Sequence, residues 1–312
     1  MSDLLAAQDA GTGAGSGDTG VGPRGGDENR SLWGDALYVL VRNPIFWIST
    51  VLVLLILSMA FAPQLWAATS PNTSGACPLL RAREEPSAAH PFGFTAAGCD
   101  MWASVVWGTG KSVIVAILAA AGATVLGVTL GTIAGYYGGF GDTVISRITD
   151  IFFGLPFVLG AIVFLALFPD RNEITISVVI AAFGWTSLAR VMRGSVISTK
   201  QKDFVDASRA VGASSLFVIR RHILTNSIAP VIVLATIALG QYIGLEATLT
   251  YLGVGYQRPT VSWGLLVNEG QSIALAGFPH LLVIPCAFIV VTVLSFILLG
   301  DALRDALDPR IR

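Results

Sequence analysis

The chain has 312 residues, of which 54% are hydrophobic and only 12% are charged, and its mean hydropathy is +0.71. Soluble domains carry about 25% charged residues, so this composition excludes an ordinary soluble protein and predicts an all-α polytopic membrane protein. The formal net charge of −1 supplies no basic field, which argues against nucleic acid as a partner.

The N-terminal part divides into a tail and a membrane-associated unit. Residues 1–30 are rich in Gly, Ala and Asp and almost lack large apolar side chains, which predicts a disordered cytoplasmic tail. Apolar residues between 31 and 42 recur on one helical face, so a helix along the membrane surface is expected. A simple extension of the first span is an equal alternative. Residues 45–62 are the first predicted span, and 31–62 form one unit.

A long polar segment, 63–110, separates the first two spans and is predicted to be an extracytoplasmic loop. It contains Cys77 and Cys99, which could form a disulfide if the loop faces an oxidising compartment. Two free thiols are the alternative. The cysteine spacing does not match a metal site and only His90 lies nearby, so no metal is expected.

The second predicted span, 112–136, carries glycines at every fourth position. Gly127, Gly131 and Gly135 share one helical face, and small residues on one face allow two helices to approach closely. The pattern leaves open whether the packed helix belongs to this chain or to a partner.

Two more spans follow, and together with the later ones they form a predicted core over 111–304 with five spans. Residues 144–168 are expected to be one span with a kink at Pro156. Residues 174–188 form a short span that ends near two arginines. A cytoplasmic segment is then predicted at 194–227.

Within that segment, residues 202–226, here named the coupling loop, carry too many charges to lie in hydrocarbon. Apolar residues recur at near-helical spacing up to Val211, and again over 216–224. Gly212 stands between them, where a chain can turn with positive φ. The pattern predicts two short helices around a glycine turn, a shape suited to docking in a partner's groove. The residues expected to matter are Phe204, Val205, Asp206, Ala207, Arg209, Gly212, Leu216, Arg220 and Leu224.

The fifth predicted span, 228–252, is the most polar and contains Gln241 and Glu246. An ionisable residue at membrane depth is costly and usually faces a bundle interior or a water-filled path. We hypothesise that Glu246 and Gln241 lie near a translocation path or its outer gate. A structural hydrogen bond from Glu246 to a neighbouring helix is an equal alternative.

The last part of the chain is predicted to contain one short helix and one span. Residues 263–272 are expected to lie at the interface with Trp263 as an anchor. Residues 281–300 form the sixth span, and 305–312 are the C-terminus. With six spans both termini lie on one side, which holds 14 of the 19 Arg and Lys residues. The positive-inside rule therefore places both termini and the coupling loop in the cytoplasm of a cell-membrane protein.

The coupling loop also contains a recognisable sequence motif. DASRAVG at 206–212, followed after nine residues by HILT at 222–225, resembles the cytoplasmic loop of ABC-importer permeases, written E-A-A, three residues, G, nine residues, I-x-L-P. Gly212 and Leu224 match in register. The departures from that pattern are Asp206, Ser208, His222 and Thr225.

Three further segments resemble the peptide- and nickel-importer branch of these permeases. They are HPFGFTAAGCD at 90–100, SWGLLVNEG at 262–270 and GDALRDALDPR at 300–310. Phe94 and Cys99 stand where members of this branch usually have threonine and arginine. Whatever that arginine does in those proteins is therefore not expected here.

The resemblance implies a six-helix type I ABC importer permease fold and a subunit of the second-permease kind. The implied function is ATP-driven import of di- or oligopeptides, with nickel as the alternative substrate. The implied partners are a second homologous permease, an extracytoplasmic substrate-binding protein and cytoplasmic ATPase domains, which hold ATP and Mg and act through the coupling loop. Membrane lipid surrounds the spans.

The chain itself is expected to be neither an enzyme nor a cofactor-binding protein. GTGKS at 108–112 ends like a phosphate-binding loop, but Val105 stands where the first glycine is required and no strand precedes it. A stand-alone secondary transporter is a less favoured alternative, because it needs ion-coupling carboxylates in paired repeats and only Glu246 lies clearly at depth.

Overall fold

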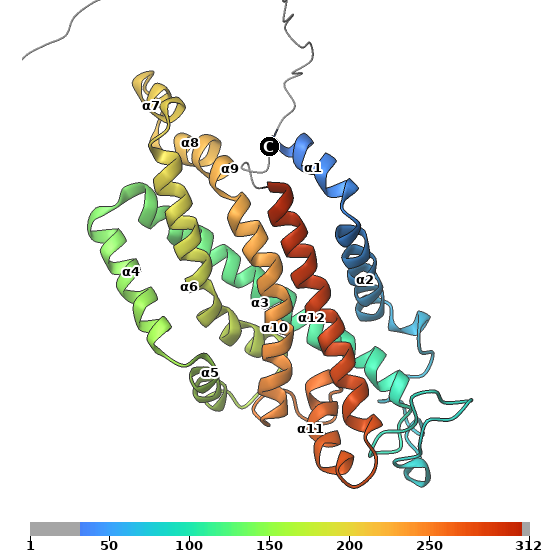
Figure 1. Cartoon of the computed structure of the whole chain (residues 1–312). Coiled ribbons are helices and arrows are strands. Elements are labelled where there is room, and N and C mark those ends of the chain that lie inside the picture. Colours follow the sequence, from blue (N-terminus) through green and yellow to red (C-terminus); the bar gives the residue numbers. More distant parts are fainter. Residues whose placement is uncertain (1–31, 308–312) are drawn as a thin grey trace, which may run out of the picture.

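The structure is a computed structural model, and it describes residues 32–307. The predictions made for residues 1–30 and 308–312 lie outside the described part. Figure 1 shows a bundle of helices whose order along the chain is α1 (Leu32–Arg42), α2 (Pro44–Phe61), α3 (Met101–Tyr137), α4 (Gly139–Gly154), α5 (Phe157–Ala166), α6 (Glu173–Lys200), α7 (Asp203–Ala210), α8 (Ser215–Val218), α9 (Leu224–Ser227), α10 (Ala229–Tyr251), α11 (Trp263–Ala274) and α12 (His280–Leu307). Within the described range the chain forms one isolated β-bridge, between Phe94 and Asp100, and no longer strand.

Within residues 32–307, five helices are long and apolar enough to cross a membrane: α2, α3, α6, α10 and α12. The third predicted span, 144–168, is the pair α4 and α5, which meet at an angle of 92°. The sequence predicts a kink within one helix, whereas the structure has a break between two separate helices. The prediction of one kinked span is therefore wrong. Pro156 lacks a backbone N–H, and it holds Leu155 in an extended conformation with ψ 126°.

Two predicted boundaries are also wrong. α3 begins at Met101, not at 112, so the loop predicted over 63–110 ends at Asp100, whose carboxylate accepts a hydrogen bond from the Ala103 amide and caps the helix. α6 continues to Lys200, not 188, so the segment predicted to begin at 194 begins at Gln201. Arg193 lies inside α6, where it forms an ion pair with Asp142 of α4 at 2.5 Å.

The core is centred on the packing of α3 against α6. A Cβ on Gly127 would lie 2.5 Å from the Leu188 Cβ, and one on Gly131 would lie 2.5 Å from the Ala189 carbonyl oxygen. Gly135 also lies close to α6, with 2.9 Å to the Arg193 carbonyl oxygen. The helix facing the glycine stripe is therefore α6 of this chain, which answers the question that the sequence left open.

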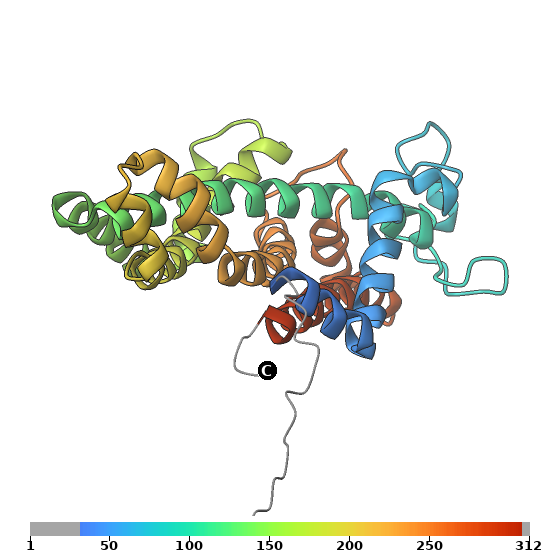
Figure 2. The same ribbon diagram turned by 90° about the horizontal axis from the view of Figure 1, so that it is seen from above.

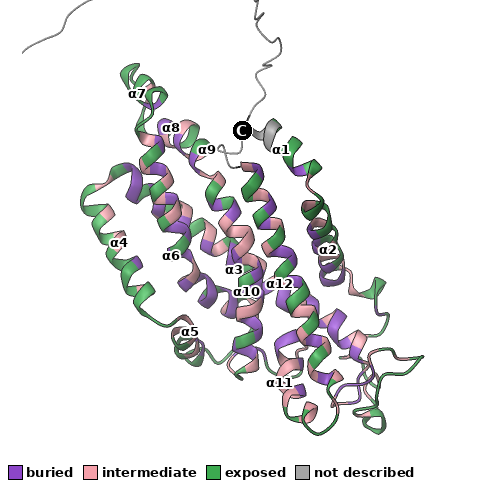
Figure 3. Cartoon of the chain, in the orientation of Figure 1, coloured by how far each residue is buried: buried purple, intermediate pink, exposed green. Residues whose placement is uncertain are grey.

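The remaining helices pack around this pair. Figure 2 shows α3 running across the width of the molecule, and Figure 3 shows that α4 is largely exposed while α3, α6 and α10 carry many buried residues. Trp263 at the start of α11 is fully buried, and its indole N–H donates to the Val105 carbonyl at 3.0 Å. Trp263 therefore joins α11 to α3 inside the protein, and its predicted role as an interfacial anchor is wrong.

Candidate functional site

The coupling loop folds into two helical segments joined by a glycine turn, and α7 projects from one end of the bundle (Figure 1). Gly212 has φ +86°, which residues with a Cβ adopt only under strain. No atom lies within 4 Å of where its Cβ would be, so the backbone conformation alone calls for glycine. α8 then starts after Ser214, whose hydroxyl accepts a hydrogen bond from the Phe217 amide, and a π-helical turn over Ile219–Ile223 joins α8 to α9.

The loop presents apolar side chains on an extramembrane surface. Leu216 and Phe217 are 62% and 52% exposed, and Val211 is 85% exposed. Of the nine residues predicted from the sequence, Val205 is buried and Leu224 is half-buried. The other seven are exposed: Phe204, Asp206, Ala207, Arg209, Gly212, Leu216 and Arg220. Apolar groups gathered on an exposed surface are typical of a protein contact.

The coupling loop is nevertheless anchored to the bundle. Val205, Val218 and Ile223 are completely buried, and the Ser227 hydroxyl donates to the Thr199 hydroxyl of α6 at 2.9 Å. The ring of His222 lies 5.9 Å from the ring of Phe204 and the same distance from that of Phe217. The loop is therefore a preformed body rather than a flexible connection.

At the opposite end of the bundle, residues 62–100 form what we name the disulfide loop. Cys77 and Cys99 are joined in a disulfide, as the sequence had allowed. His90 Nδ1 lies 2.7 Å from the Asp100 carboxylate, the same group that caps α3. The indole N–H of Trp107 in α3 donates to the Ala67 carbonyl at 3.1 Å, which holds the loop against the helix.

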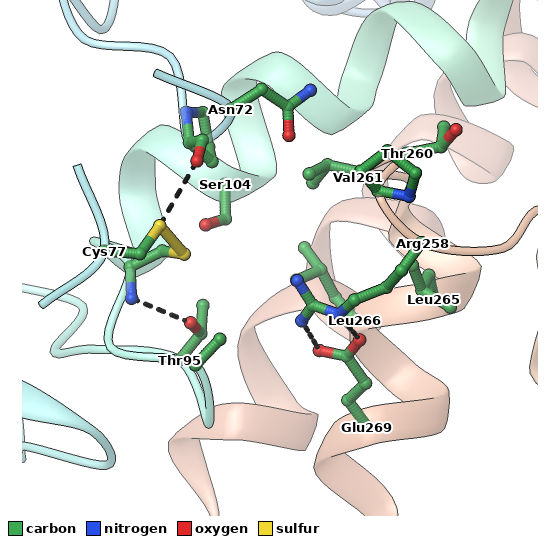
Figure 4. A pocket seen from close by; sticks show the side chains of 14 residues that line it. Asn72, Cys77, Thr95, Ser104, Arg258, Thr260, Val261, Leu265, Leu266 and Glu269 are labelled. Carbon is green, nitrogen blue, oxygen red and sulfur yellow. Dashed lines mark hydrogen bonds and ion pairs between the residues drawn. A yellow bond between two sulfur atoms is a disulfide. The ribbon is translucent and has the colours of Figure 1, made fainter. Parts of the chain in front are cut away.

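A cavity of about 510 Å³ lies between the disulfide loop and the segment that leads into α11. Figure 4 shows Arg258 and Glu269 directed toward each other in its wall, opposite Cys77. The guanidinium donates to both carboxylate oxygens, at 2.7 and 2.5 Å. The sequence does not reveal this pair, because the two residues are 11 apart and belong to no recognised motif.

Glu246 lies inside the subunit. Its side chain is fully buried, and Thr250 donates a hydrogen bond to Oε1 at 2.8 Å. Oε2 of the same carboxyl group has no hydrogen-bond partner among the described residues. Glu246 therefore lies inside the subunit and does not line an open surface, and its hydrogen bond is made within α10 rather than to a neighbouring helix.

Gln241 lies on the exposed side of the same helix, α10. Gly244 and Thr248 follow it at helical spacing, Thr248 is also exposed, and nothing lies within 4 Å of a Cβ on Gly244. A polar stripe on the outer face of a membrane span is costly against lipid, so such a face usually meets a partner helix or water.

Two protein families match the chain. Residues 127–312 match the binding-protein-dependent transport system inner membrane component, and residues 31–76 match the N-terminal TM domain of oligopeptide transport permease C. The chain is 33% identical over 282 residues to the oligopeptide transport system permease protein OppC of Bacillus subtilis (strain 168), covering 90% of this chain and 91% of that protein.

Other relatives are of the same kind. The dipeptide transport system permease protein DppC of Alkalihalophilus pseudofirmus is 36% identical over 284 residues, covering 90% of this chain and 91% of that protein. The glutathione transport system permease protein GsiD of Pectobacterium atrosepticum is 36% identical over 232 residues, covering 74% of this chain and 76% of its own length.

A solved structure of the MetNI methionine ABC transporter, in inward facing conformations, has the same fold. The TM-score is 0.52 at 20% identity, and the match covers 66% of this chain and 97% of that chain. The six-span permease fold, the sequence motif of the coupling loop and the family matches agree with one another. The chain therefore belongs to the binding-protein-dependent transport system inner membrane components, the membrane-spanning permeases of ABC importers.

Proposed function

We propose that the chain forms one half of the substrate path in an ATP-driven importer of di- or oligopeptides, the other half being a second homologous permease. The observation that carries the proposal is the preformed coupling loop, with its exposed apolar residues and its glycine turn at Gly212. The relatives named for oligopeptide, dipeptide and glutathione systems support a peptide substrate.

The energy comes, in this proposal, from ATP and Mg held by cytoplasmic ATPase domains in other chains. GTGKS at 108–112 lies inside α3, where the backbone amides are used in helical hydrogen bonds and cannot cradle a phosphate. The coupling loop, α1 and the end of α12 lie at the same end of the bundle (Figure 1), and the excess of Arg and Lys in the flanking segments supports a cytoplasmic position for that end. The extracytoplasmic substrate-binding protein would meet the opposite end.

We assign the substrate path to the polar stripe of α10 that contains Gln241, Gly244 and Thr248. Uncharged polar side chains can form hydrogen bonds with the amides of a peptide substrate, and these bonds are weak enough for the substrate to be released. A membrane-impermeant maleimide is expected to label Thr248→Cys in the assembled importer faster than Val290→Cys, which is 54% exposed on the apolar α12. Equal labelling rates at both positions would contradict the assignment of the substrate path to this stripe.

Gly212 provides the test of the coupling loop. Gly212→Val should insert in the membrane but fail to couple ATP hydrolysis to transport, because valine is strained at φ +86°. Gly194→Val in α6 is the matched control, since there is also no atom within 4 Å of its Cβ position and its φ is not positive. Gly212→Asn should recover part of the activity, because asparagine tolerates positive φ. Full transport by Gly212→Val would refute the role of the turn.

Co-purification separates the proposal from a stand-alone secondary transporter. A tag on this chain should bring down an ATPase and a second permease from the native membrane, and uptake of a labelled dipeptide should require ATP. Uptake driven by an ion gradient, with no ATPase bound, would overturn the proposed function.

A further inference from the structure

Tyr136 lies in the last turn of α3, next to Gly135 of the glycine stripe, and is only 6% exposed. Its carbonyl oxygen accepts a hydrogen bond from the Lys200 ammonium, at the end of α6, with an N–O distance of 2.5 Å. Carbonyls in the last turn of a helix have no partner within the helix, and a cation there also favours the helix dipole. The backbone of Tyr136 thus ties the ends of α3 and α6 together.

The side chain of Tyr136 reaches the coupling loop. The contact is made by its ring, which faces Arg209 of α7. The Arg209 guanidinium carbon lies 5.4 Å from the centre of its ring, and the Lys200 ammonium lies 5.5 Å from it. Both cations are within range of a cation–π attraction. Asp206, 3.5 Å from Arg209, holds that arginine from the same helix.

α3 and α6 are packed too closely to slide independently. A Cβ on Gly135 would lie 2.9 Å from the Val196 Cβ, and the contacts at Gly127 and Gly131 are closer still. Backbone contacts of this kind leave no flexible side chain to absorb a relative displacement. A force applied at the end of α3 therefore moves α3 and α6 as one unit.

We propose that Tyr136 is the positioning residue through which movement of the coupling loop reaches the membrane spans. Its ring contacts Arg209 of α7, and its backbone and ring contact Lys200 at the end of α6. When the partner ATPase moves the coupling loop, Arg209 pulls on the Tyr136 ring, and the α3–α6 unit follows. The inference rests on the proposed function and names the contact that performs the coupling.

The test compares two adjacent tyrosines in the complete importer, purified through a tag on this chain and placed in liposomes. Tyr136→Leu should assemble and hydrolyse ATP, while the amount of labelled dipeptide transported per ATP falls roughly tenfold, the effect expected from losing two cation–π contacts. Tyr136→Phe, which keeps the ring, should lose less. Tyr137→Leu is the matched control, because Tyr137 is 62% exposed, and it should couple normally.

A distance measurement separates coupling from general stability. Spin labels at Lys202→Cys, exposed at the start of the coupling loop, and at Val125→Cys, 62% exposed on α3, are introduced in a Cys286→Ser background. In the parent protein ATP should leave the distance distribution narrow, since the loop and α3 move together. In Tyr136→Leu it should broaden on ATP binding, whereas in Tyr137→Leu it should not.

The outcomes are distinguishable. If the parent importer shows no ATP-driven uptake, the proposed function fails, whatever the variants do. If the parent importer couples and Tyr136→Leu couples equally well with an unchanged distance distribution, only the inference fails. Should Tyr136→Leu fail to assemble, Arg209→Leu decides, because it removes the cation from the Tyr136 ring at an exposed position. An unchanged ratio of transport to ATP in that variant overturns the role of Tyr136.

Discussion

The disulfide loop and the coupling loop leave the bundle at opposite ends (Figure 1). They keep their shapes by different means. The disulfide loop closes on itself through Cys77 and Cys99, and it buries Phe94 and Thr95, which are 4% and 3% exposed. The coupling loop has no cross-link and keeps Leu216 and Val211 largely exposed.

The difference concerns how each loop keeps its shape, because the disulfide loop also exposes apolar residues: Leu65, Leu79 and Leu80 are 82%, 77% and 98% exposed. A loop with its own covalent closure and buried residues needs no partner to keep its shape. A loop that exposes leucine, valine and phenylalanine outside the membrane gains free energy when another protein covers them. Changes in the disulfide loop should therefore affect the stability of the chain, and changes in the coupling loop should affect assembly.

The largest effect is expected at Gly98 in the disulfide loop. Its φ is +79°, and a Cβ there would lie 2.2 Å from the Pro78 carbonyl oxygen, so Gly98→Ala combines backbone strain with a clash and should cost about 4 kcal/mol. Gly75→Ala is the matched control, with φ +81° but no atom within 4 Å, and should cost about 1 kcal/mol. Thermal unfolding in detergent measures both. Equal losses would show that the loop is not closely packed at Gly98.

Removal of the disulfide should have the next largest effect. Cys77 and Cys99 are separated by 22 residues, so replacing both with alanine should lower the free energy of unfolding by about 3 kcal/mol through the freer unfolded chain. A reductant should lower the melting temperature of the parent protein to a similar extent, while Cys286→Ser should keep the parent response. A parent protein indifferent to reductant would contradict a structural role.

Leu216→Asp in the coupling loop should leave the stability of the isolated chain unchanged, because Leu216 is 62% exposed. It should weaken the association with the ATPase by about 2 kcal/mol, the value of burying a leucine. Leu275→Asp, at a leucine that is 93% exposed near α11, is the control and should bind normally. The measurement is the amount of ATPase retained on the tagged chain. Equal retention by both variants would place the docking surface elsewhere.

The smallest overall effect is expected for Asp206→Asn. Asp206 and Arg209 are 3.5 Å apart, with side chains 68% and 36% exposed, and such pairs contribute about 0.5 kcal/mol or less. The melting temperature should scarcely change at any salt concentration. A large loss would mean that the coupling loop depends on its own ion pair for its shape, which would remove the contrast with the disulfide loop.

Much of the fold could be predicted from the sequence because apolar runs of membrane length have few alternatives. The first span and the helix–glycine–helix order of the coupling loop follow from local composition and spacing. The ends of α3 and α6 were not predictable in this way. Both helices extend beyond the hydrocarbon, where a polar residue no longer distinguishes helix from loop: α3 is about 55 Å long at 1.5 Å per residue.

The candidate site was predictable only in part, for the same reason. Gly212 could be found because positive φ is a local property of one residue. Tyr136, Lys200 and Arg209 belong to different helices and carry no common motif, and Arg258 and Glu269 meet only where a loop folds back on α11. Such juxtapositions depend on the path of the whole chain.

The sequence by itself determined the membrane class, the glycine stripe and the short two-helix loop, because each depends on residues close together in the chain and on their transfer between water and hydrocarbon. Only the tertiary structure decided that the stripe packs on α6, that Glu246 is buried inside the subunit, and that the third span breaks by 92°. Those outcomes depend on which surfaces meet, and close packing between distant segments settles them.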